Sequence, residues 1–367
     1  MSVAPVAPPA EDYKYVNFLE TFNCTTINGK IGIALFGVGR AGMIHLNNLS
    51  QNKRVNLLYV VEQDNERNKK VEATSGLETT KFVNSSKMDL VLDDPKVQGV
   101  VITTPTQTHH AIVVESLNKG KAVFCEKPIA NRIKEIKDCY NLAKEKNLPL
   151  LCAFNRRFDP SFLNVRDRVR KGELGDKVHI IKSTSRDSPL PSIDYLKTSN
   201  GIFHDCAVHD IDLLCWIMGE YPTKVFSTAT AHMPHIKAIN DHDTVTISLT
   251  FPSGGMGNID LSRFANYGYD QRLEVFGPGG MLQCGNQNTL GVQSYTSGNV
   301  REPPIWYSFA SRYDEAYKKE LEHFLDVIDG KEKLSILSTE TLSVCQVASS
   351  CEESVRTGKP VEMVYDF

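Results

Sequence analysis

The sequence has no apolar run long enough to cross a membrane, which requires about 18 consecutive apolar residues. It also has no excess of basic residues, because 41 Lys and Arg stand against 44 Asp and Glu, giving a net charge of −3. Nucleic acids and anionic membranes attract basic surfaces, and no basic stripe is visible in the chain. These absences argue against a nucleic-acid partner and against a membrane partner.

The cysteines include no Cys-x-x-Cys pair, which argues against a zinc site. They are odd in number and stand at positions 24, 125, 139, 152, 206, 215, 284, 345 and 351. His232, His235 and His242 have no carboxylate at a matching helical spacing, so we interpret them as surface residues. We therefore expect reduced thiols, no disulfide framework, no bound metal and a cytosolic protein. The N-terminal segment also lacks the basic start and the apolar stretch of a secretory signal.

The length predicts two domains, because 367 residues exceed the about 100–200 residues of an ordinary domain. Residues 1–29 are rich in Pro and Ala near their start and predict a disordered tail. Residues 30–154 then alternate short apolar runs with helical patterns. The expected strands are residues 31–36, 55–61, 97–103, 122–125 and 150–154. Strands that are apolar on both faces and separated by helices predict a parallel sheet covered on both sides.

The pattern changes in residues 155–367, where strands follow one another without a regular alternation with helices. The expected helices are residues 159–171, 203–218, 315–328 and 339–356. The expected strands are residues 178–183, 244–251, 256–264 and 272–276. This order predicts a second domain of the α+β class with a mostly antiparallel sheet. No internal repeat and no long linker is visible.

A glycine motif lies between the first expected strand and the first expected helix. It reads Gly37-Val38-Gly39-Arg40-Ala41-Gly42 and matches the G-x-G-x-x-G pattern of dinucleotide-binding Rossmann domains. In that pattern the first glycine permits a tight turn, the second lets the backbone approach the pyrophosphate, and the third allows close packing of helix on strand. The helix N-terminus adds N–H groups for the phosphates. The alternative is a purely structural turn before an ordinary helix.

An acidic residue ends the second expected strand, 20 positions beyond the last glycine of the motif. This residue, Glu62, is placed to accept hydrogen bonds from the ribose hydroxyls and to repel a 2′-phosphate, which favours NAD over NADP. Asp64 is the rival for this role, and either carboxylate can equally be a solvated strand end. Arg40 is placed either to reach the pyrophosphate or to point into solvent.

Three further segments accompany the glycine motif in a fixed order. They are Thr-Thr-Pro-Thr-Gln-Thr-His at 103–109, Cys-Glu-Lys-Pro at 125–128 and Gly-Ile-Phe-His-Asp-Cys-Ala-Val-His-Asp-Ile-Asp at 201–212. With this set, residues 30–365 resemble the Gfo/Idh/MocA oxidoreductase family, most of all its myo-inositol 2-dehydrogenase branch. The resemblance implies an α/β fold, in which a Rossmann domain precedes a domain with a large open sheet and the nicotinamide lies in the cleft between them. It also implies a homodimer or homotetramer formed through the C-terminal sheet.

The resemblance assigns roles to single residues of these segments. The cofactor site would be lined by Thr104, Pro105, His109 and Glu126. The catalytic residues would be Lys127, Asp205 and His209. The positions themselves agree, since Lys127 follows a strand at the sheet edge where ligands bind. Asp205, His209 and Asp212 share one face if they lie on one helix, although a solvated polar face is the alternative.

The expected substrate contacts are Asn155, Arg156, Asp212 and Tyr269. Asn155 and Arg156 follow the last Rossmann strand, and one of the two neighbouring arginines can instead brace the domains. Tyr269 and Tyr267 share a face if extended, and such a pair also suits packing. The chain departs from the inositol-type pattern at Asn200-Gly201, where that pattern has Gly-Gly, and at Cys206 and Cys215. These departures make the polyol or sugar class a firmer expectation than inositol itself.

Together these residues predict NAD-dependent oxidation of a secondary alcohol on a cyclic polyol or sugar. His209, whose type has an ordinary pKa of about 6.5, would take the hydroxyl proton. Asp205 would orient the imidazole, and Lys127 would donate to the same oxygen. The rival functions are an NADP(H)-dependent keto-sugar reductase of the same family, a non-catalytic regulator that senses a dinucleotide, and a structural protein.

Overall fold

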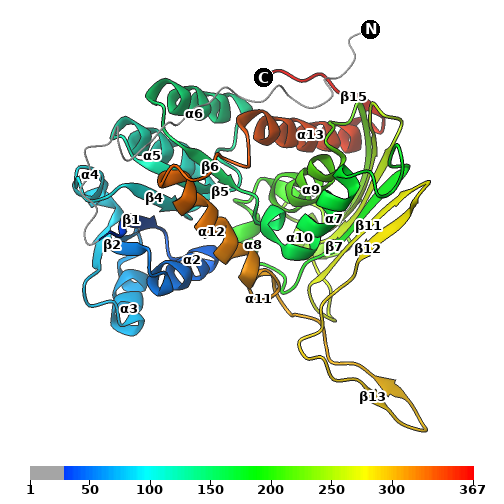
Figure 1. Ribbon diagram of the computed structural model, residues 1–367, viewed down its shortest axis with the longest axis horizontal. Coiled ribbons are helices and arrows are strands. Elements are labelled where there is room, and N and C mark those ends of the chain that lie inside the picture. Colours follow the sequence, from blue (N-terminus) through cyan, green and yellow to red (C-terminus); the bar gives the residue numbers. More distant parts are fainter. Residues whose placement is uncertain (1–28) are drawn as a thin grey trace. The chain divides into compact units, whose positions relative to one another are not determined.

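The computed structural model describes residues 29–367, so nearly all of the predicted tail and Cys24 lie outside the described residues (Figure 1). The described chain forms two compact units. The N-terminal unit contains residues 29–155 and Tyr317–Leu342, and the C-terminal unit contains Arg156–Ala316 and Ser343–Phe367. Within residues 29–367, no helix combines the length and the apolar character needed to cross a membrane.

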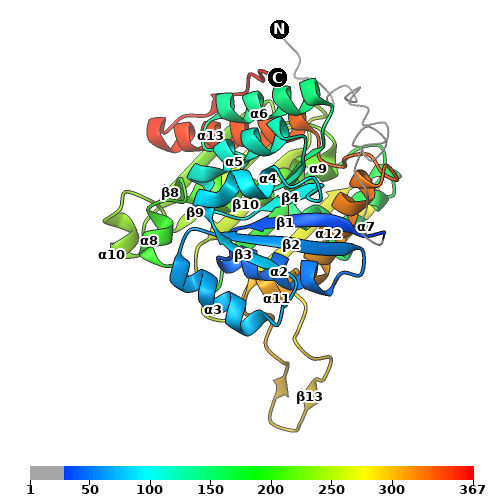
Figure 2. The same ribbon diagram turned by 90° about the vertical axis from the view of Figure 1, so that its left-hand side faces the viewer.

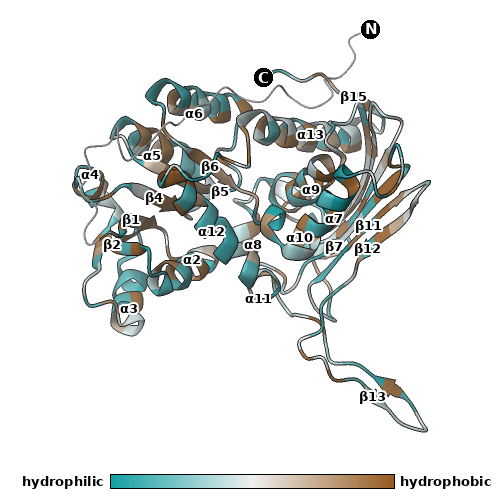
Figure 3. Ribbon diagram, viewed as in Figure 1, coloured by the Kyte–Doolittle hydropathy of each residue, from teal (hydrophilic) through white to brown (hydrophobic). Residues whose placement is uncertain are grey.

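The N-terminal unit is built on a parallel sheet of six strands. These are β1 (Ile31–Phe36), β2 (Val55–Glu62), β3 (Lys81–Asn84), β4 (Gly99–Ile102), β5 (Ala122–Glu126) and β6 (Leu150–Ala153). Their order, β3-β2-β1-β4-β5-β6, is the Rossmann order, which reverses between β1 and β4. Every residue of β1 and β4 is buried, because helices cover both faces of the sheet. The brown strands of Figure 3 show this apolar layer.

The helices of this unit follow the strands in alternation. They are α2 (Arg40–Gln51), α3 (Asn65–Ser75), α4 (Met88–Leu92), α5 (Thr106–Asn118) and α6 (Ile133–Lys146), with a 3₁₀ turn, η1, at Ser85–Lys87. Figure 2 shows α2 and α3 on one side of the sheet and α5 and α6 on the other. In α6 the buried residues are Ile136, Cys139, Tyr140 and Ala143, a spacing that places one apolar face on the sheet.

The second segment of the N-terminal unit differs from the sequence-based division, which placed residues 155–367 together. It includes most of α12 (Asp314–Ile328), whose Phe324 packs edge-on against Phe124 of β5 at 5.6 Å between ring centroids. Arg54 also joins this segment through Glu322 and Asp329, both at 2.7 Å. Apolar packing and ion pairs thus bring this part of the chain back to the Rossmann sheet.

The C-terminal unit contains a sheet of seven strands in the order β12-β11-β7-β10-β9-β8-β15. The strands are β7 (Ile180–Arg186), β8 (Lys224–Thr230), β9 (Thr244–Thr250), β10 (Met256–Ser262), β11 (Asp270–Gly277), β12 (Gly280–Cys284) and β15 (Val361–Glu362). Only the β7–β10 pair of this sheet is parallel, so the expectation of a mostly antiparallel sheet is confirmed. In β9 buried Val245, Ile247 and Leu249 alternate with exposed polar residues, as expected when one face meets the core.

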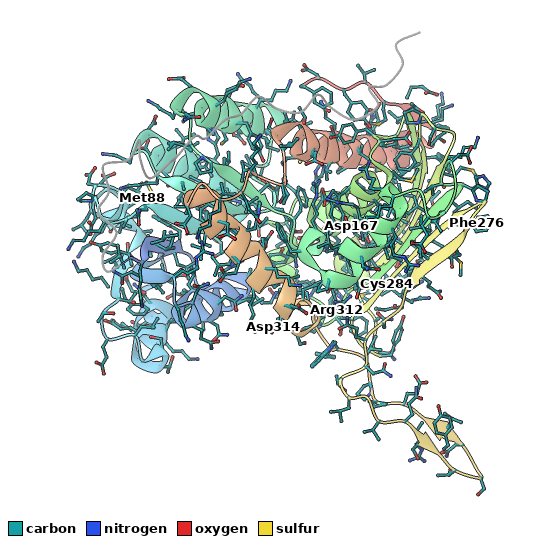
Figure 4. The ribbon with its side chains drawn as sticks, viewed as in Figure 1. Met88, Asp167, Phe276, Cys284, Arg312 and Asp314 are labelled. Atoms are coloured by element: carbon teal, nitrogen blue, oxygen red, sulfur yellow. The ribbon has the colours of Figure 1, made fainter. Side chains whose placement is uncertain are left out.

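Helices cover the inner face of this sheet. They include α7 (Pro160–Arg170), α8 (Ile193–Leu196), α9 (Val208–Met218), α10 (Pro234–Lys237), α11 (Phe309–Arg312) and part of α13 (Ser338–Thr357), with a 3₁₀ turn, η2, at Asn155–Phe158. The outer face carries exposed apolar side chains, among them Ile180, Met256 and Phe276, which are 38%, 53% and 43% exposed. Figure 4 labels Phe276 on the side of the sheet away from the helices.

A hairpin that the sequence did not predict leaves this unit between β12 and α11. Its strands are β13 (Ser294–Tyr295) and β14 (Val300–Arg301), which pair antiparallel. Figures 1 and 2 both show it extending away from the seven-stranded sheet. Leu290 and Tyr295 on it are 66% and 71% exposed. The short strands and polar composition of this segment explain why no strand pattern stood out.

Candidate functional site

The glycine motif forms a tight turn between β1 and α2, as predicted. Gly37 has φ +90°, a conformation that favours glycine. A Cβ on Gly42 would lie 2.3 Å from the Gly37 carbonyl oxygen, so any larger residue would force the turn and the helix apart. A Cβ on Gly39 would meet no described atom within 4 Å. This open side at the start of α2 suits the approach of a phosphate group to the backbone.

Glu62 lies directly against this turn. Its carboxylate accepts hydrogen bonds from the backbone N–H groups of Val38 and Asp64, both at 3.0 Å, and Glu62 is 7% exposed. The rival Asp64 instead caps α3 and accepts from the N–H groups of Glu66 and Arg67. Of the two acids, only Glu62 contacts the glycine turn, and this contact favours it as the ribose ligand.

The Thr-Thr-Pro segment follows β4 and is tied to the glycine turn. The hydroxyl of Thr103, which the sequence analysis did not single out, donates to the carbonyls of Phe36 and Gly37 at 3.0 and 2.8 Å. Thr104 and Pro105 then lead into α5, with Pro105 at the N-cap of the helix. The carboxyl ends of β1 and β4 meet here, at the position where ligands bind to doubly wound sheets.

His109 lies between this segment and the segment after β5, and its predicted cofactor contact stays a prediction. It is 2% exposed, and its Nδ1 and Nε2 lie 2.8 Å from the carbonyl oxygens of Pro128 and Thr104. Burial lowers the pKa of His109 more than the two nearby carbonyl oxygens raise it, so the ring is neutral at neutral pH. A neutral ring carries one N–H, which one of the two carbonyls accepts. His109 therefore links Thr104 to the segment that carries Lys127.

The Glu-Lys-Pro segment follows β5, with a cis peptide between Lys127 and Pro128. Lys127 is partly exposed at the carboxyl edge of the sheet, as predicted. Glu126, predicted to meet the cofactor, pairs with the fully buried His45 of α2 at 2.9 Å. His45 belongs to none of the predicted site residues. Its position on α2, one turn after Gly42, is the signal that could have identified it. Glu126 thus fastens α2 to the strand that presents Lys127.

The sequence predicted that Asp205 and His209 share one regular α-helix. In the structure of the C-terminal unit they do not. Asp205 lies on a π-helical turn, η3 (Phe203–Ala207), and His209 on the α-helix α9 that follows it. Turns of this kind are rare and often mark functional sites. Asp205 is 9% exposed and accepts hydrogen bonds from Tyr195 Oη at 2.8 Å and Arg263 Nη1 at 2.9 Å. His209 is partly exposed.

The chain enters this turn through Asn200 and Gly201. Both residues have positive φ, at +62° and +77°. Asn is among the few side-chain-bearing residues that adopt this conformation readily. Asn at position 200 is therefore compatible with the backbone observed here.

The predicted substrate contacts are largely buried. Asn155, Arg156, Asp212 and Tyr269 are between 1% and 7% exposed. Arg157 donates to Asp212 through Nε and Nη2, at 3.0 and 2.5 Å, and Arg156 donates to Asp210 at 2.8 Å. Arg156 and Asp212 therefore each take part in a buried ion pair within the unit, and their predicted substrate roles stay predictions. Tyr269 packs edge-on against Tyr313.

Family models match both parts of the chain. The model described as an oxidoreductase family with an NAD-binding Rossmann fold matches residues 31–154, and the model of the GFO/IDH/MocA C-terminal domain matches residues 162–283. Together these two matches cover more than half of the chain.

Individual relatives span nearly the whole chain. The inositol 2-dehydrogenase of Rhizobium meliloti is 33% identical over 91% of this chain and 99% of its own length. The scyllo-inositol 2-dehydrogenase (NAD(+)) of Bacillus subtilis is 30% identical over 91% of this chain and 96% of its own. The solved myo-inositol dehydrogenase of Corynebacterium glutamicum is 31% identical, with a TM-score of 0.83 over 92% of this chain and 100% of that one.

Proposed function

Because the chain belongs to the GFO/IDH/MocA oxidoreductase family, we propose that it oxidises a secondary alcohol of an inositol or a closely related cyclic polyol. The chain is an NAD-dependent dehydrogenase acting on CH–OH groups, and the proposal concerns its substrate and its residues. One feature carries the proposal most directly. It is the π-helical turn together with the start of α9, where the partly exposed imidazole of His209 follows the Asp205 carboxylate, which accepts from Arg263 and Tyr195.

The N-terminal unit has the residues to hold NAD. The open side of the turn at Gly39 and the start of α2 suit the pyrophosphate, and Glu62 suits the ribose hydroxyls. Thr104 and Pro105, at the carboxyl end of β4, lie where the nicotinamide half would extend. NAD, when bound, supplies the hydride acceptor.

The remaining chemistry falls to the protein, which must take the hydroxyl proton and stabilise the oxygen. In the proposal His209 takes that proton, a task suited to an imidazole, whose ordinary pKa is about 6.5. Asp205 holds the imidazole and favours its charged form. Lys127 donates to the same oxygen and stabilises the negative charge that develops there.

A substrate screen tests the proposal. The purified full-length protein is incubated with inositol isomers, hexoses and pentoses, each with NAD and with NADP, and the absorbance of the reduced cofactor is followed. We expect turnover of at least one inositol with NAD. Turnover only of keto-sugars with NADPH would favour the reductase alternative, and dinucleotide binding without turnover of any compound would favour a sensor.

The contact between Glu62 and the glycine turn predicts the cofactor preference. Replacing Glu62 with Gln removes the charge, and the loss of a charge-assisted hydrogen bond of about 1.5–3 kcal/mol should weaken NAD binding about 10- to 100-fold. NADP binding should weaken less, because the repulsion of its 2′-phosphate also disappears. Titration calorimetry with both dinucleotides measures the two changes.

The matched control is Asp64→Asn, two residues away at the N-cap of α3. It should lower stability slightly while keeping the ratio of NAD to NADP affinity. Equal changes of that ratio in both variants would contradict the role of Glu62.

We also propose that copies of the chain associate through the outer face of the seven-stranded sheet, as a homodimer or homotetramer. The exposed apolar side chains of that face, such as Met256 and Phe276, support this. Sedimentation equilibrium that detects only a 41.0-kDa species at micromolar concentration would contradict it. A cytosolic location remains a prediction from the cysteine pattern.

A further inference from the structure

A buried arginine outside the expected catalytic set organises the Asp205 turn. Arg263 follows β10 directly and is 0% exposed. Its guanidinium donates from Nη1 to Asp205 at 2.9 Å, from Nη2 to Asp241 at 2.8 Å, and from Nε to the carbonyl of His242 at 3.2 Å. A fully buried cation requires such partners, because burial without them costs several kcal/mol. Each of the three guanidinium nitrogens therefore donates a hydrogen bond to a protein acceptor.

Asp241 connects the same arginine to the start of the turn. Its second carboxylate oxygen, Oδ1, accepts from the N–H of Ile202 at 3.1 Å and of His242 at 2.8 Å. Ile202 directly precedes the π-helical turn that carries Asp205. One carboxylate thus holds Arg263 on one side and the entrance of the turn on the other. The position of Asp205 is fixed at two points by a single cluster.

Arg263 is far more deeply buried than Tyr195, which also donates to Asp205. The other anchor, Tyr195, is 42% exposed and belongs to α8, a helix of four residues. Arg263 is held by the end of a central strand of the sheet and by three acceptors. Cys206, the neighbour of Asp205, also lies against Arg263, with Sγ 3.4 Å from Nη1.

We propose that Arg263 is a positioning residue for the reaction, holding the Asp205 carboxylate in the orientation from which it supports His209. This inference rests on the proposed function, in which Asp205 and His209 serve one proton transfer. The planar arrangement of the guanidinium N–H donors is essential to this role. Lysine keeps the charge but cannot hold Asp205, Asp241 and the His242 carbonyl in one plane.

The structure offers a comparison in a second buried arginine of the same unit. Arg312, labelled in Figure 4, donates to Asp159 at 2.6 Å, and the two residues are 5% and 2% exposed. This pair lies in the same unit, and Asp159 caps α7 rather than contacting the proposed catalytic turn. Arg263→Lys and Arg312→Lys therefore make the same chemical change in two buried ion pairs of one unit.

The test compares these two variants in the full-length protein with the polyol that the wild type turns over best. We expect Arg263→Lys to lower kcat about 10- to 100-fold, as a small misplacement of a supporting group does. Its NAD affinity should stay within about twofold of wild type, because only the Asp205 turn is disturbed. Arg312→Lys should lower the melting temperature but leave kcat near the wild-type value. Equal losses of kcat in the two variants would overturn the positioning role.

A double-mutant cycle separates action through Asp205 from an independent effect. If Arg263 acts through Asp205, Arg263→Lys should cost little further kcat in an Asp205→Asn background. Losses that multiply would overturn the inference. Asp241→Asn provides a second route if Arg263→Lys folds poorly, since it loosens the arginine while keeping an acceptor for Ile202. It should show the same non-additivity with Asp205→Asn, and multiplying losses would again overturn the inference.

Different results would overturn the proposed function and the positioning role of Arg263. A wild-type protein that oxidises no polyol with NAD overturns the proposed function and this inference with it. A wild-type protein that is active, with multiplying losses in the cycle, overturns the positioning role alone.

Discussion

Replacing His209 with alanine should reduce kcat for polyol oxidation by about 10²- to 10⁴-fold, the usual contribution of a general acid or base. The reason is that the hydroxyl proton would then have to leave without a positioned acceptor. NAD affinity should change little, because the glycine turn and Glu62 belong to the other unit. Steady-state kinetics and a separate NAD titration measure the two quantities.

Lys127→Ala should show the same separation, with kcat strongly reduced and NAD affinity nearly intact. The matched controls are exposed residues of the same types, His235→Ala and Lys119→Ala. These should retain wild-type kinetics. If His209→Ala and Lys127→Ala both kept wild-type turnover, the assigned chemistry would be wrong, whatever the substrate.

Replacing Asp212 with alanine should lower the free energy of unfolding by about 3–5 kcal/mol, the usual cost of removing one partner of a buried ion pair. Asp212 is 1% exposed, and Arg157 donates to it through both Nε and Nη2. Its removal leaves the Arg157 cation buried without that carboxylate. Urea denaturation followed by circular dichroism measures the loss.

The control for this variant is Asp167→Ala, which breaks a surface pair with Arg166 whose side chains are 43% and 35% exposed. Figure 4 labels Asp167 on α7. Solvent screening should keep its cost below about 1 kcal/mol. A raised KM with unchanged stability in Asp212→Ala would instead support the substrate role predicted for Asp212.

The fold was predictable where strong local patterns decided it. The apolar runs of β1 and β4, followed by helical periodicity, were sufficient to indicate a covered parallel sheet. The edge strand β3 was missed because Lys81–Asn84 is half-exposed and has no apolar run. The return of α12 to the Rossmann sheet was missed because it depends on Phe324 meeting Phe124, a contact between distant parts of the chain.

The site was predictable to the extent that motifs place residues at strand ends. The spacing of the motifs correctly placed Glu62 and Lys127 at the carboxyl edge of the sheet. It could not identify which residue pairs with each charge. The ion pair of Asp212 could not be predicted, because its partner Arg157 lies 55 positions earlier in the sequence. Arg263 could not be predicted either, because a single arginine after a strand belongs to no motif.

The Asn200-Gly201 turn has a consequence for comparing this chain with other sequences. Two successive left-handed residues restrict which amino acids can stand there, because a β-branched residue at position 200 would cost roughly 1–2 kcal/mol. Gly, Asn and Asp are therefore the residues that this backbone conformation favours at position 200. We expect a homologue with Val or Ile at this position to have a different backbone conformation before the corresponding turn. Variation at this position should therefore be interpreted as a difference in loop geometry rather than in substrate choice.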